Sequence, residues 1–404
     1  GTEDNRVRRM DYSIQVSKLF YERFINDEEI TLFSPHQAPG LYDAFGMPEF
    51  DELYLKYEKD KTIPKKKIKA QDLFFDLLKE RAETGRIYIM NIDHANTHSS
   101  FKDRISMSNL CQEITLPTTP IQHIDDGQGE IALCILSAVN VGSISNLDEL
   151  KNLCDLSVRS LDEIIDYQDY PVKAAEVSTK ARRSLGIGYI GLAHYLAKQG
   201  YKYSDKGAWE STDRLSEAFQ YYLLKASNEV AKEKGKCTGF DRTKYADGQL
   251  PIDHYKKEVD EIVPHKQRYA WEALRKDIAK HGLRHSTLSA QMPSESSSVV
   301  SNATNGVEPP RALLSIKKSK KGPLKQIVPG YPKLKNDYTL LWEMPSNEGY
   351  INVVSVMQKY FDQAISGNWS YNPLKFENNE VPLSVMATDM LNTYKYGWKT
   401  SYYQ

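Results

Sequence analysis

The sequence predicts an α/β protein in which buried parallel strands are covered by amphipathic helices. Apolar runs of strand length, such as Ile87–Ile92 and Leu185–Leu192, alternate with segments whose apolar residues recur at helical spacing. Alternating helices and continuously apolar strands are typical of parallel sheets that are buried on both faces. The pattern fits either an open sheet or a barrel.

The first clear helix and strand lie close together in the N-terminal quarter. Apolar residues recur at the spacing of an amphipathic helix at Ala70, Leu73, Phe74, Leu77 and Leu78. Gly85 is of the residue type that commonly ends a helix. The strand Ile87–Ile92 follows directly, so the helix and the strand form one compact unit.

A second strand is predicted at Ile131–Val141, ahead of a long helix. Asn146 and Glu149 have the spacing of a capping box, which opens a helix. The inward face of that helix is Leu147, Leu150, Leu153, Cys154, Val158, Leu161 and Ile165. A third strand at Leu185–Leu192 comes next.

Another helix and several shorter elements fill the second half. The helix carries one apolar stripe and ends before Gly235, with Leu215, Phe219, Tyr222, Ala226 and Val230 on the stripe. Ser286–Met292 is predicted as a short strand that Pro293 stops. The remaining features are a solvated loop or hairpin at Lys317–Lys325, apolar clusters at Leu340–Trp342 and Tyr350–Val354, and a helix over Val381–Tyr396.

Composition excludes several classes of protein. The 404 residues include 53 Lys and Arg against 54 Asp and Glu, which argues against binding of a nucleic acid polymer by bulk charge. The four cysteines are too few for a disulfide-built secreted protein. The longest apolar run, Ile131–Val139, is shorter than the roughly 20 residues of a membrane-spanning helix. The first six residues carry no signal-peptide pattern, so we expect a cytoplasmic chain with reduced cysteines.

Two motif matches are weak. Gly186 to Gly191 fits GxGxxG, but the glycines lie inside an apolar run, where they favour close helix packing over dinucleotide binding. His94 and His98 are four residues apart, yet Asn91–Ser100 is rich in polar residues and predicts a loop. No third ligand is evident, so we expect no metal site.

The most informative segment is Met107–Ile114. Asn109, Cys111 and Glu113 occupy alternate positions, and in an extended strand or loop tip alternate side chains point the same way. An amide, a thiol and a carboxylate in one small volume can bind a hydroxyl, attack through sulfur and move a proton. Three ordinary loop residues are the alternative.

Three further features are ambiguous by themselves. Cys134, inside a predicted strand, is by itself a buried structural cysteine. Hydroxyls and backbone N–H groups after the strand at 286–292 form either a phosphate cradle or an N-capping serine cluster. The residues concerned are Pro293, Ser294, Glu295, Ser296 and Ser297. Tyr402 and Tyr403 form an adjacent pair in a chain that has 26 tyrosines.

In this order, the motifs resemble the large catalytic subunit of class I ribonucleotide reductase. The resemblance rests on the segment 109–113, Cys134, the run from Pro293, the segment Asn305–Arg311 and the tyrosine pair. Thr31–Pro35, Gly85–Ile89 and Leu340–Pro345 are also similar to that family. The similarity extends over essentially all 404 residues.

The resemblance implies the C-terminal portion of a ten-stranded α/β barrel with a central finger loop. It implies that Cys111 carries a thiyl radical, that Glu113 accepts the proton of the 3′-hydroxyl, and that Asn109 binds the substrate. Leu110 and Gln112 then belong to the substrate-binding tip. Cys134 is implied as one of two redox thiols, residues 293–297 as the phosphate site, and Tyr402 and Tyr403 as steps of a radical relay.

The resemblance also implies partners. The family's large subunit is longer, so residues 1–404 correspond to a single incomplete barrel domain that lacks the N-terminal regulatory domain, the first part of the barrel and the other redox cysteine. We expect a separate N-terminal fragment, as in a split subunit of the kind plausible in phages, or a truncated piece. The expected partners are a metal-containing small subunit that supplies the radical, a ribonucleoside diphosphate, and a thioredoxin- or glutaredoxin-type reductant, with no cofactor bound directly.

Two alternative functions remain open. The first is a non-catalytic assembly or scaffold fragment of the same complex, which is suggested by the missing redox thiol. The second is a glycyl-radical enzyme on the same barrel. Such an enzyme carries a C-terminal glycyl loop, whereas Trp398–Gln404 has the tyrosine pair instead.

Overall fold

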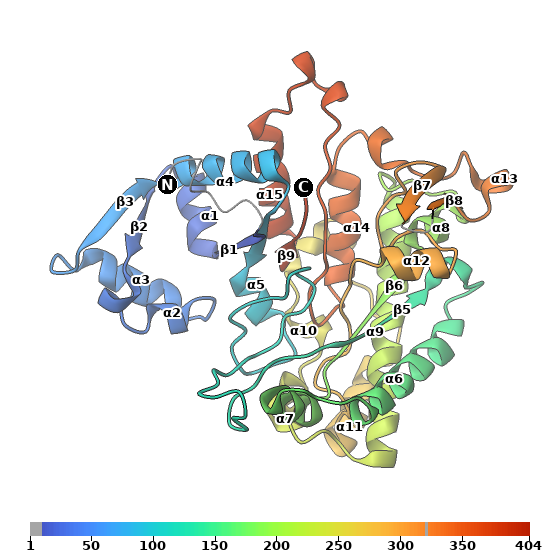
Figure 1. Ribbon diagram of the computed structural model, residues 1–404, viewed down its shortest axis with the longest axis horizontal. Coiled ribbons are helices and arrows are strands. Elements are labelled where there is room, and N and C mark those ends of the chain that lie inside the picture. The colour runs from blue at the N-terminus through green and yellow to red at the C-terminus, as the bar shows by residue number, and fades with distance from the viewer. Residues whose placement is uncertain (1–9, 320–321) are drawn as a thin grey trace.

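The computed structural model describes residues 10–319 and 322–404. Its strands form several small sheets, with most helices packed around them (Figure 1). The first six residues, whose sequence lacks a signal-peptide pattern, lie outside the described residues. Within the described ranges, every helix is too short or too polar to cross a membrane.

A three-stranded sheet joins both ends of the chain. β1 (Tyr12–Val16) pairs in parallel with β4 (Ile87–Asn91), and β9 (Thr400–Ser401) pairs antiparallel with the other edge of β4. All five residues of β4 are buried, which explains its continuous apolar sequence. The strand predicted at Ile87–Ile92 is therefore confirmed to within one residue.

A second parallel pair consists of β5 (Ile135–Asn140) and β6 (Leu185–Ile190). All of β6 is buried. β5 begins four residues later than predicted, because residues 131–134 make no ladder with a neighbouring strand. The segment predicted as a strand at Ser286–Met292 is extended but irregular, and only its Ser289 and Gln291 form isolated parallel bridges.

These pieces join edge to edge into one curved array. The Leu185 amide donates to Thr287 O at 3.1 Å, so residues 287–291 lie beside β6. The Gln291 amide donates to Ala364 O at 3.1 Å, which adds residues 363–367. The Tyr402 amide donates to Gly367 O at 2.8 Å, which connects that segment to the β9 side of the first sheet. The array runs from β5 to β1 without closing, as expected for part of a barrel.

Long helices cover this array. α9 (Lys206–Lys234) packs against α6 (Glu149–Tyr167), α11 (Trp271–His281) and α14 (Glu348–Gln358). Its apolar face joins that of β6 in the main core, where Ile187 and Tyr189 lie among Leu215 and Phe219. α15 (Leu383–Lys395) packs against α4 (Ala70–Thr84) and α14. The helices predicted around residues 70–84, 215–230 and 381–396 are thus confirmed.

The other helices are short. They are α1 (Lys18–Ile25), α2 (Leu41–Ala44), α3 (Phe50–Lys59), α5 (Ile92–Thr97), α7 (Lys173–Arg182), α8 (Leu192–Ala197), α10 (Pro251–His254), α12 (Glu295–Val300) and α13 (Tyr331–Leu334). β2 (Glu29–Phe33) pairs antiparallel with β3 (Lys65–Lys69), and with α2 and α3 they project to one side of the main body (Figure 1).

The lysine-rich stretch forms a hairpin, as predicted. β7 (Leu314–Ser319) and β8 (Gly322–Ile327) pair antiparallel, with residues 320–321 outside the described ranges.

Gly85 ends α4 as predicted. It adopts a left-handed conformation with φ of 69°, and its amide donates to Arg81 O at 2.8 Å. Such a C-terminal glycine satisfies one of the last helical carbonyls without the steric cost of a Cβ atom.

The predicted capping box is wrong. α6 begins at Glu149, with Asp148 as its N-cap. Asn146 accepts from the Asp148 amide at 2.9 Å, and Glu149 accepts from the Ser145 amide at 3.0 Å. The two side chains therefore satisfy donors in the turn before the helix, because short polar side chains compete for nearby amides.

The predicted loop at Asn91–Ser100 is also wrong, because α5 occupies its centre. Ile92 and Ala95 are buried on one face, and this tertiary burial outweighs the polar composition. His94 Nδ1 lies 3.0 Å from Trp398 O, while the His98 ring packs edge-on against His254 at 5.1 Å. Among the described residues no group of three or more His, Cys, Asp or Glu is placed to hold a metal.

The glycines of the GxGxxG match serve close packing of extended segments. A Cβ on Gly188 would lie 2.6 Å from Ala290 O, and one on Gly186 would lie 2.6 Å from Cys134 Sγ. The sequence predicts close packing of a helix here, and the structure differs. Instead the glycines let the segment 287–291 and Cys134 approach β6, because only hydrogen fits there.

Candidate active site

The segment 109–113 forms a tight turn. The Gln112 amide donates to Asn109 O at 3.1 Å, and Gln112 has a left-handed φ of 67°. Asn109 Oδ1 accepts from the Ile114 amide at 3.0 Å. Of the two settings that the sequence allows for this segment, an extended strand or a loop tip, the structure has the loop tip, and the Asn109 side chain bonds that of Glu113 there.

This turn is docked on residues 363–367 of the curved array. The Ala364 amide donates to Glu113 O at 3.0 Å, and the Thr115 amide donates to Gln363 Oε1 at 3.3 Å. Leu110, at the tip, is 61% exposed, whereas Gln112 is buried. This segment, residues 109–113, is the tip of the finger loop. It presents one face to solvent, and its other face is fixed against the array.

Cys111 and Glu113 meet at a shared partner. Ser366 Oγ lies 2.5 Å from Cys111 O and 3.2 Å from Glu113 Oε2. Burial raises the pKa of Glu113, although hydrogen bonds from Asn109, its own backbone and Ser366 oppose the shift. A carboxylate with a raised pKa is a stronger base than an ordinary one, which suits it to accept a proton.

A tyrosine cluster reaches the sulfur of Cys111. The Tyr402 hydroxyl lies 3.6 Å from Cys111 Sγ, and its ring centroid is 3.9 Å from that of Tyr403. Tyr88 of β4 packs on both rings, at 4.7 and 5.5 Å. Tyr402 is 5% exposed and Tyr403 is 41% exposed, so the cluster connects the surface to the thiol.

Burial controls the ionisation of these groups. It raises the pKa of Cys111, an effect that the Tyr402 hydrogen bond opposes and the Glu113 charge increases. It also raises the pKa of Tyr402, with added contributions from Tyr403 and Cys111. Both groups are therefore neutral at physiological pH, so any oxidation of either must remove a proton together with an electron.

Arg81 holds the backbone of the tyrosine pair. Its guanidinium donates to Tyr402 O at 2.8 Å and to Tyr403 O at 3.1 Å, and it packs over Trp369 at 4.8 Å. Arg81 is fully buried, and burial lowers its pKa to about 9. We did not predict a role for Arg81, because α4 gave only an amphipathic pattern.

Cys134 lies just before β5, next to the same array. Gln363 Nε2 lies 3.5 Å from Cys134 Sγ and 2.9 Å from Leu185 O. Burial raises the pKa of Cys134, and the Gln363 amide opposes that shift. Gln363 therefore links the thiol to the finger loop through Thr115. All four cysteines are free.

The run 293–297 forms the start of the short helix α12. Ser294 is its N-cap residue, but Ser294 Oγ donates to Met292 O at 3.1 Å and does not cap the helix. The exposed residues are Pro293, Glu295, Ser296 and Ser297. The run follows Gln291, whose carbonyl accepts from the Ser366 amide, so the array connects this helix start to the finger loop.

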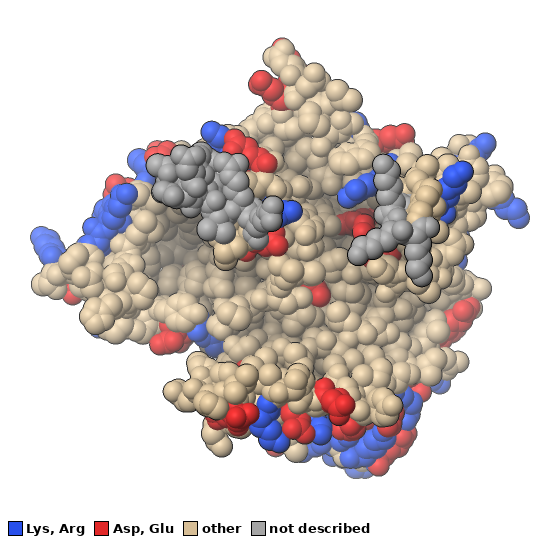
Figure 2. Space-filling view, in the orientation of Figure 1, with Lys and Arg blue, Asp and Glu red and all other residues tan. Residues whose placement is uncertain are grey.

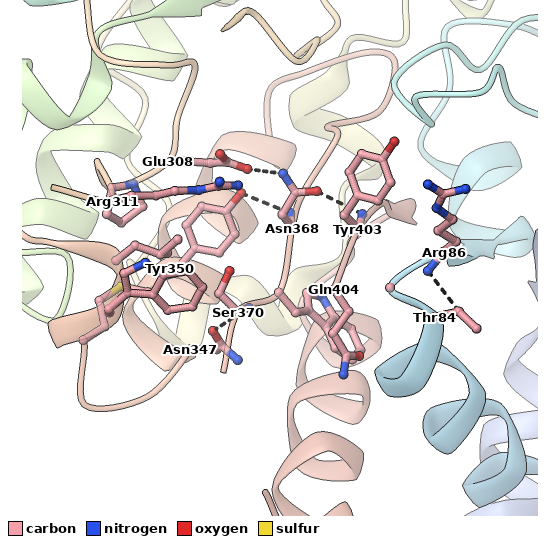
Figure 3. Close-up of a pocket in the computed structure, with 16 residues that line it drawn as sticks. Thr84, Arg86, Glu308, Arg311, Asn347, Tyr350, Asn368, Ser370, Tyr403 and Gln404 are labelled. Carbon is pink, nitrogen blue, oxygen red and sulfur yellow. Dashed lines mark hydrogen bonds between the residues drawn. The ribbon is translucent and has the colours of Figure 1, made fainter. Parts of the chain in front are cut away.

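A cavity of about 320 Å³ lies beside the exposed ring of Tyr403 (Figure 3). Asn368 Oδ1 accepts from the Tyr403 amide at 2.9 Å, and its Nδ2 donates to Glu308. Arg86 and Arg311 lie on opposite sides of this cavity (Figure 3). In the orientation of Figure 1, the centre of the face in view is hollowed and carries few charged side chains (Figure 2).

Comparison with known proteins decides the family. The family model described as "Ribonucleotide reductase, barrel domain" matches residues 1–404. The chain belongs to this family. Membership confirms the predicted resemblance and, with the open array of strands, the predicted fold class of an α/β barrel portion.

Curated relatives agree with this assignment. The chain is 59% identical to the ribonucleoside-diphosphate reductase subunit alpha of Haemophilus influenzae, over 100% of this chain and 54% of the relative. It is 56% identical to ribonucleoside-diphosphate reductase 1 subunit alpha of Escherichia coli K12 and 43% identical to the subunit alpha of Enterobacteria phage T4, with the same coverage. The chain therefore spans about half the length of these relatives.

Proposed function

We propose that this chain is the catalytic C-terminal part of a ribonucleoside-diphosphate reductase large subunit. It would reduce ribonucleotides to deoxyribonucleotides for DNA replication. The contact between Tyr402 Oη and Cys111 Sγ, at 3.6 Å, is the observation that carries the proposal. It joins a chain of phenols to a thiol that lies next to a buried carboxyl.

Cys111 is proposed to carry a thiyl radical. A hydrogen atom moves from the 3′ carbon of the ribose to the sulfur, so an S–H bond forms as a C–H bond breaks. The two bonds have similar strength, which makes the transfer reversible. Glu113 takes the 3′-hydroxyl proton as a general base, and its raised pKa supports this role. The Asn109 amide steadies the resulting ketone-like intermediate.

The tip of the loop and the start of α12 are proposed to bind the substrate. Leu110 and Gln112 flank Cys111 at the tip, where Leu110 is exposed. Hydroxyls and first-turn amides at Pro293, Ser294, Glu295, Ser296 and Ser297 would hold the phosphates. Because α12 has only six residues, the proposal for this run rests on the family resemblance and on its connection to the finger loop through the array.

Tyr402 and Tyr403 are proposed to relay the radical from a small subunit. Their ring centroids lie 3.9 Å apart, and exposure decreases from Tyr403 to Tyr402, in the direction of Cys111. The radical would originate at a metal in the small subunit. This chain would bind no metal itself.

Cys134 is proposed to be one of two redox thiols. The pair would give two electrons and two protons to the substrate, whose departing hydroxyl leaves as water, and would end as a disulfide, which a thioredoxin- or glutaredoxin-type donor would reduce. Cys154 in α6 and Cys237 in the loop after α9 are both buried, so we propose that the second thiol comes from elsewhere. A reaction with such donors fits a cytoplasmic location.

We further propose that residues 1–404 are a single incomplete barrel domain that needs the rest of a large subunit. In the described part of the chain, β5 pairs with β6 alone, and Leu133 and Leu136 beside that edge are 38% and 43% exposed. Exposed apolar side chains along an unpaired edge favour addition of further strands. An N-terminal fragment would supply those strands and the missing thiol.

The test is reconstitution. This chain, an N-terminal fragment of a relative's large subunit, the small subunit and a dithiol reductant are mixed with cytidine diphosphate, and deoxynucleotide is measured. We expect turnover that disappears in Cys111→Ala and persists in Cys237→Ala, a buried cysteine away from the loop. Stable complex formation without turnover would instead support the scaffold alternative.

A further inference from the structure

Ser366 contacts two functional parts of the finger loop with one hydroxyl. Its oxygen lies 2.5 Å from the Cys111 carbonyl and 3.2 Å from Glu113 Oε2. A serine hydroxyl has one proton and two lone pairs. It therefore donates to only one of these two oxygens at a time, and the shorter distance makes the Cys111 carbonyl the acceptor in this structure.

The backbone around Ser366 is fixed on both sides. The Ser366 amide donates to Gln291 O at 2.9 Å, and Thr400 Oγ1 donates to Ile365 O at 3.1 Å. The next residue, Gly367, accepts from the Tyr402 amide at 2.8 Å. The hydroxyl is thus held at a set place, on a segment that also holds the inner tyrosine.

We propose that Ser366 is a positioning residue that couples the protonation of Glu113 to the backbone of Cys111. The inference rests on the proposed function of the site. When Glu113 is charged, Ser366 donates to the carboxylate, because a charged acceptor makes the stronger hydrogen bond. When Glu113 has taken up the substrate proton, its O–H donates to Ser366 Oγ. The serine proton then rotates to the Cys111 carbonyl, and every proton stays on its own oxygen.

The consequence is that proton uptake tightens the hold on the radical-bearing residue. In the charged state Ser366 turns its proton to the carboxylate, and its oxygen moves away from the Cys111 carbonyl beyond the 2.5 Å of this structure, because no proton then lies between the two oxygens. In the protonated state the Cys111 carbonyl gains a full hydrogen bond, at the stage when the Cys111 sulfur carries the hydrogen taken from the substrate. Ser366 would thus fix the thiol for return of that hydrogen.

Other titratable groups near Glu113 do not produce this effect. They are Cys111 on the same loop, Cys134 beside β5, and Tyr402, which contacts Cys111. Burial raises the pKa of all three, so they stay neutral where a carboxyl titrates. Asn109 and the backbone of Glu113 also donate to the carboxylate, but Ser366 is the donor that also bonds the Cys111 carbonyl. Its removal should therefore move the Glu113 titration and free the Cys111 carbonyl together.

The first measurement is the titration of the Glu113 carboxyl in the full chain, followed by infrared spectroscopy. The spectra of Glu113→Gln are subtracted to isolate the signal of this carboxyl. Ser366→Ala removes a donor to the charged form, so the pKa of Glu113 should rise by about one unit. In the reconstituted enzyme the acid limb of the pH–rate profile should move to higher pH by the same amount. We expect kcat to fall about tenfold and KM to change less than about twofold.

Two variants serve as controls. Thr400→Val removes another buried hydroxyl that bonds the same segment, and it should lower stability without moving the titration. Ser366→Thr keeps a donor, and its titration should match the wild type. A Ser366→Ala titration within about 0.2 unit of the wild type, or an equal shift in Thr400→Val or Ser366→Thr, would overturn the inference.

These readouts also separate this inference from the proposed function. A shifted Glu113 titration in a chain that gives no turnover would leave the Ser366 coupling standing and refute the catalytic proposal. Turnover in Ser366→Ala with an unshifted Glu113 titration and an unshifted acid limb would support the catalytic proposal and refute the Ser366 coupling.

Discussion

The hydroxyl of Tyr402 lies 3.6 Å from the sulfur of Cys111, although 291 positions separate the two residues. β9 brings the C-terminal segment beside β4, and residues 363–367 hold both the tyrosine backbone and the finger loop. This contact makes the phenols and the thiol a single continuous path.

Loss of either phenol hydroxyl should interrupt that path. Tyr402→Phe and Tyr403→Phe keep the aromatic rings but remove the phenol O–H. A phenylalanine ring cannot lose an electron and a proton at the potential at which tyrosine does. We expect turnover of the reconstituted enzyme to disappear while the substrate Kd stays within about twofold. Turnover and equilibrium binding are measured separately. Tyr167→Phe, at a site that is 91% exposed, is the matched control, and turnover retained in Tyr403→Phe would refute the relay.

The amide of Gln363 should set the reactivity of Cys134. Because this amide opposes the burial effect on the pKa of Cys134, Gln363→Leu should raise that pKa further. The thiolate is the nucleophile, so alkylation of Cys134 by iodoacetamide at pH 8 should slow about tenfold. The rate is followed by mass spectrometry of the Cys134 peptide. Gln122→Leu, in an exposed turn, should alkylate like the wild type, and an unchanged rate in Gln363→Leu would argue against the contact.

A buried ion network beneath β6 should dominate local stability. Asp162 is fully buried and contacts Arg183 at 2.6 Å and His285 at 3.1 Å. Asp162→Asn removes the buried charge that faces Arg183 and His285 and leaves the arginine only its more exposed partner, so the free energy of unfolding should fall by about 3 kcal/mol. Asp166 also contacts Arg183, but its side chain is 53% exposed. Asp166→Asn should therefore cost less than about 1 kcal/mol. Urea unfolding measures both variants, and equal losses would contradict this account.

Stability should decrease on mild acidification. Burial lowers the pKa of His254 to about 3 and that of His194 to about 4, so both stay neutral in the folded chain at pH 5.5. The unfolded chain binds protons at these histidines below about pH 6.5. The stability that these two neutral histidines contribute is thus fully present above that pH, and it is lost as the pH falls toward their pKa values in the folded chain.

The size of this effect can be tested at one residue. The His254 contribution between pH 7.5 and 5.5 should be about 1 kcal/mol. His254→Gln should lose that part of the pH dependence in urea unfolding, whereas His123→Gln, whose side chain is 74% exposed, should keep it. An equal dependence of the free energy of unfolding on pH in the wild type, His254→Gln and His123→Gln would show that His254 does not take up a proton on unfolding.

The amino-acid sequence by itself determined several of the central strands and long helices. Continuous apolar runs gave β4 and β6, and apolar spacing gave α4, α9 and α15, because these patterns reflect which face of an element is buried. It failed at α5 and at the start of α6. There, packing of Ile92 and Ala95 or local bonds of Asn146 and Glu149 outweighed composition.

The order of the motifs along the chain also identified the candidate site residues. Asn109, Cys111, Glu113, Cys134 and the tyrosine pair were all candidates before the structure was known. Only the tertiary structure decided how they meet. The left-handed turn at Gln112, the contacts of Ser366 and Gln363, and the support from Arg81 join segments that are distant in sequence. Local patterns carry no signal for such contacts, because they arise when separate strands pack edge to edge around one loop.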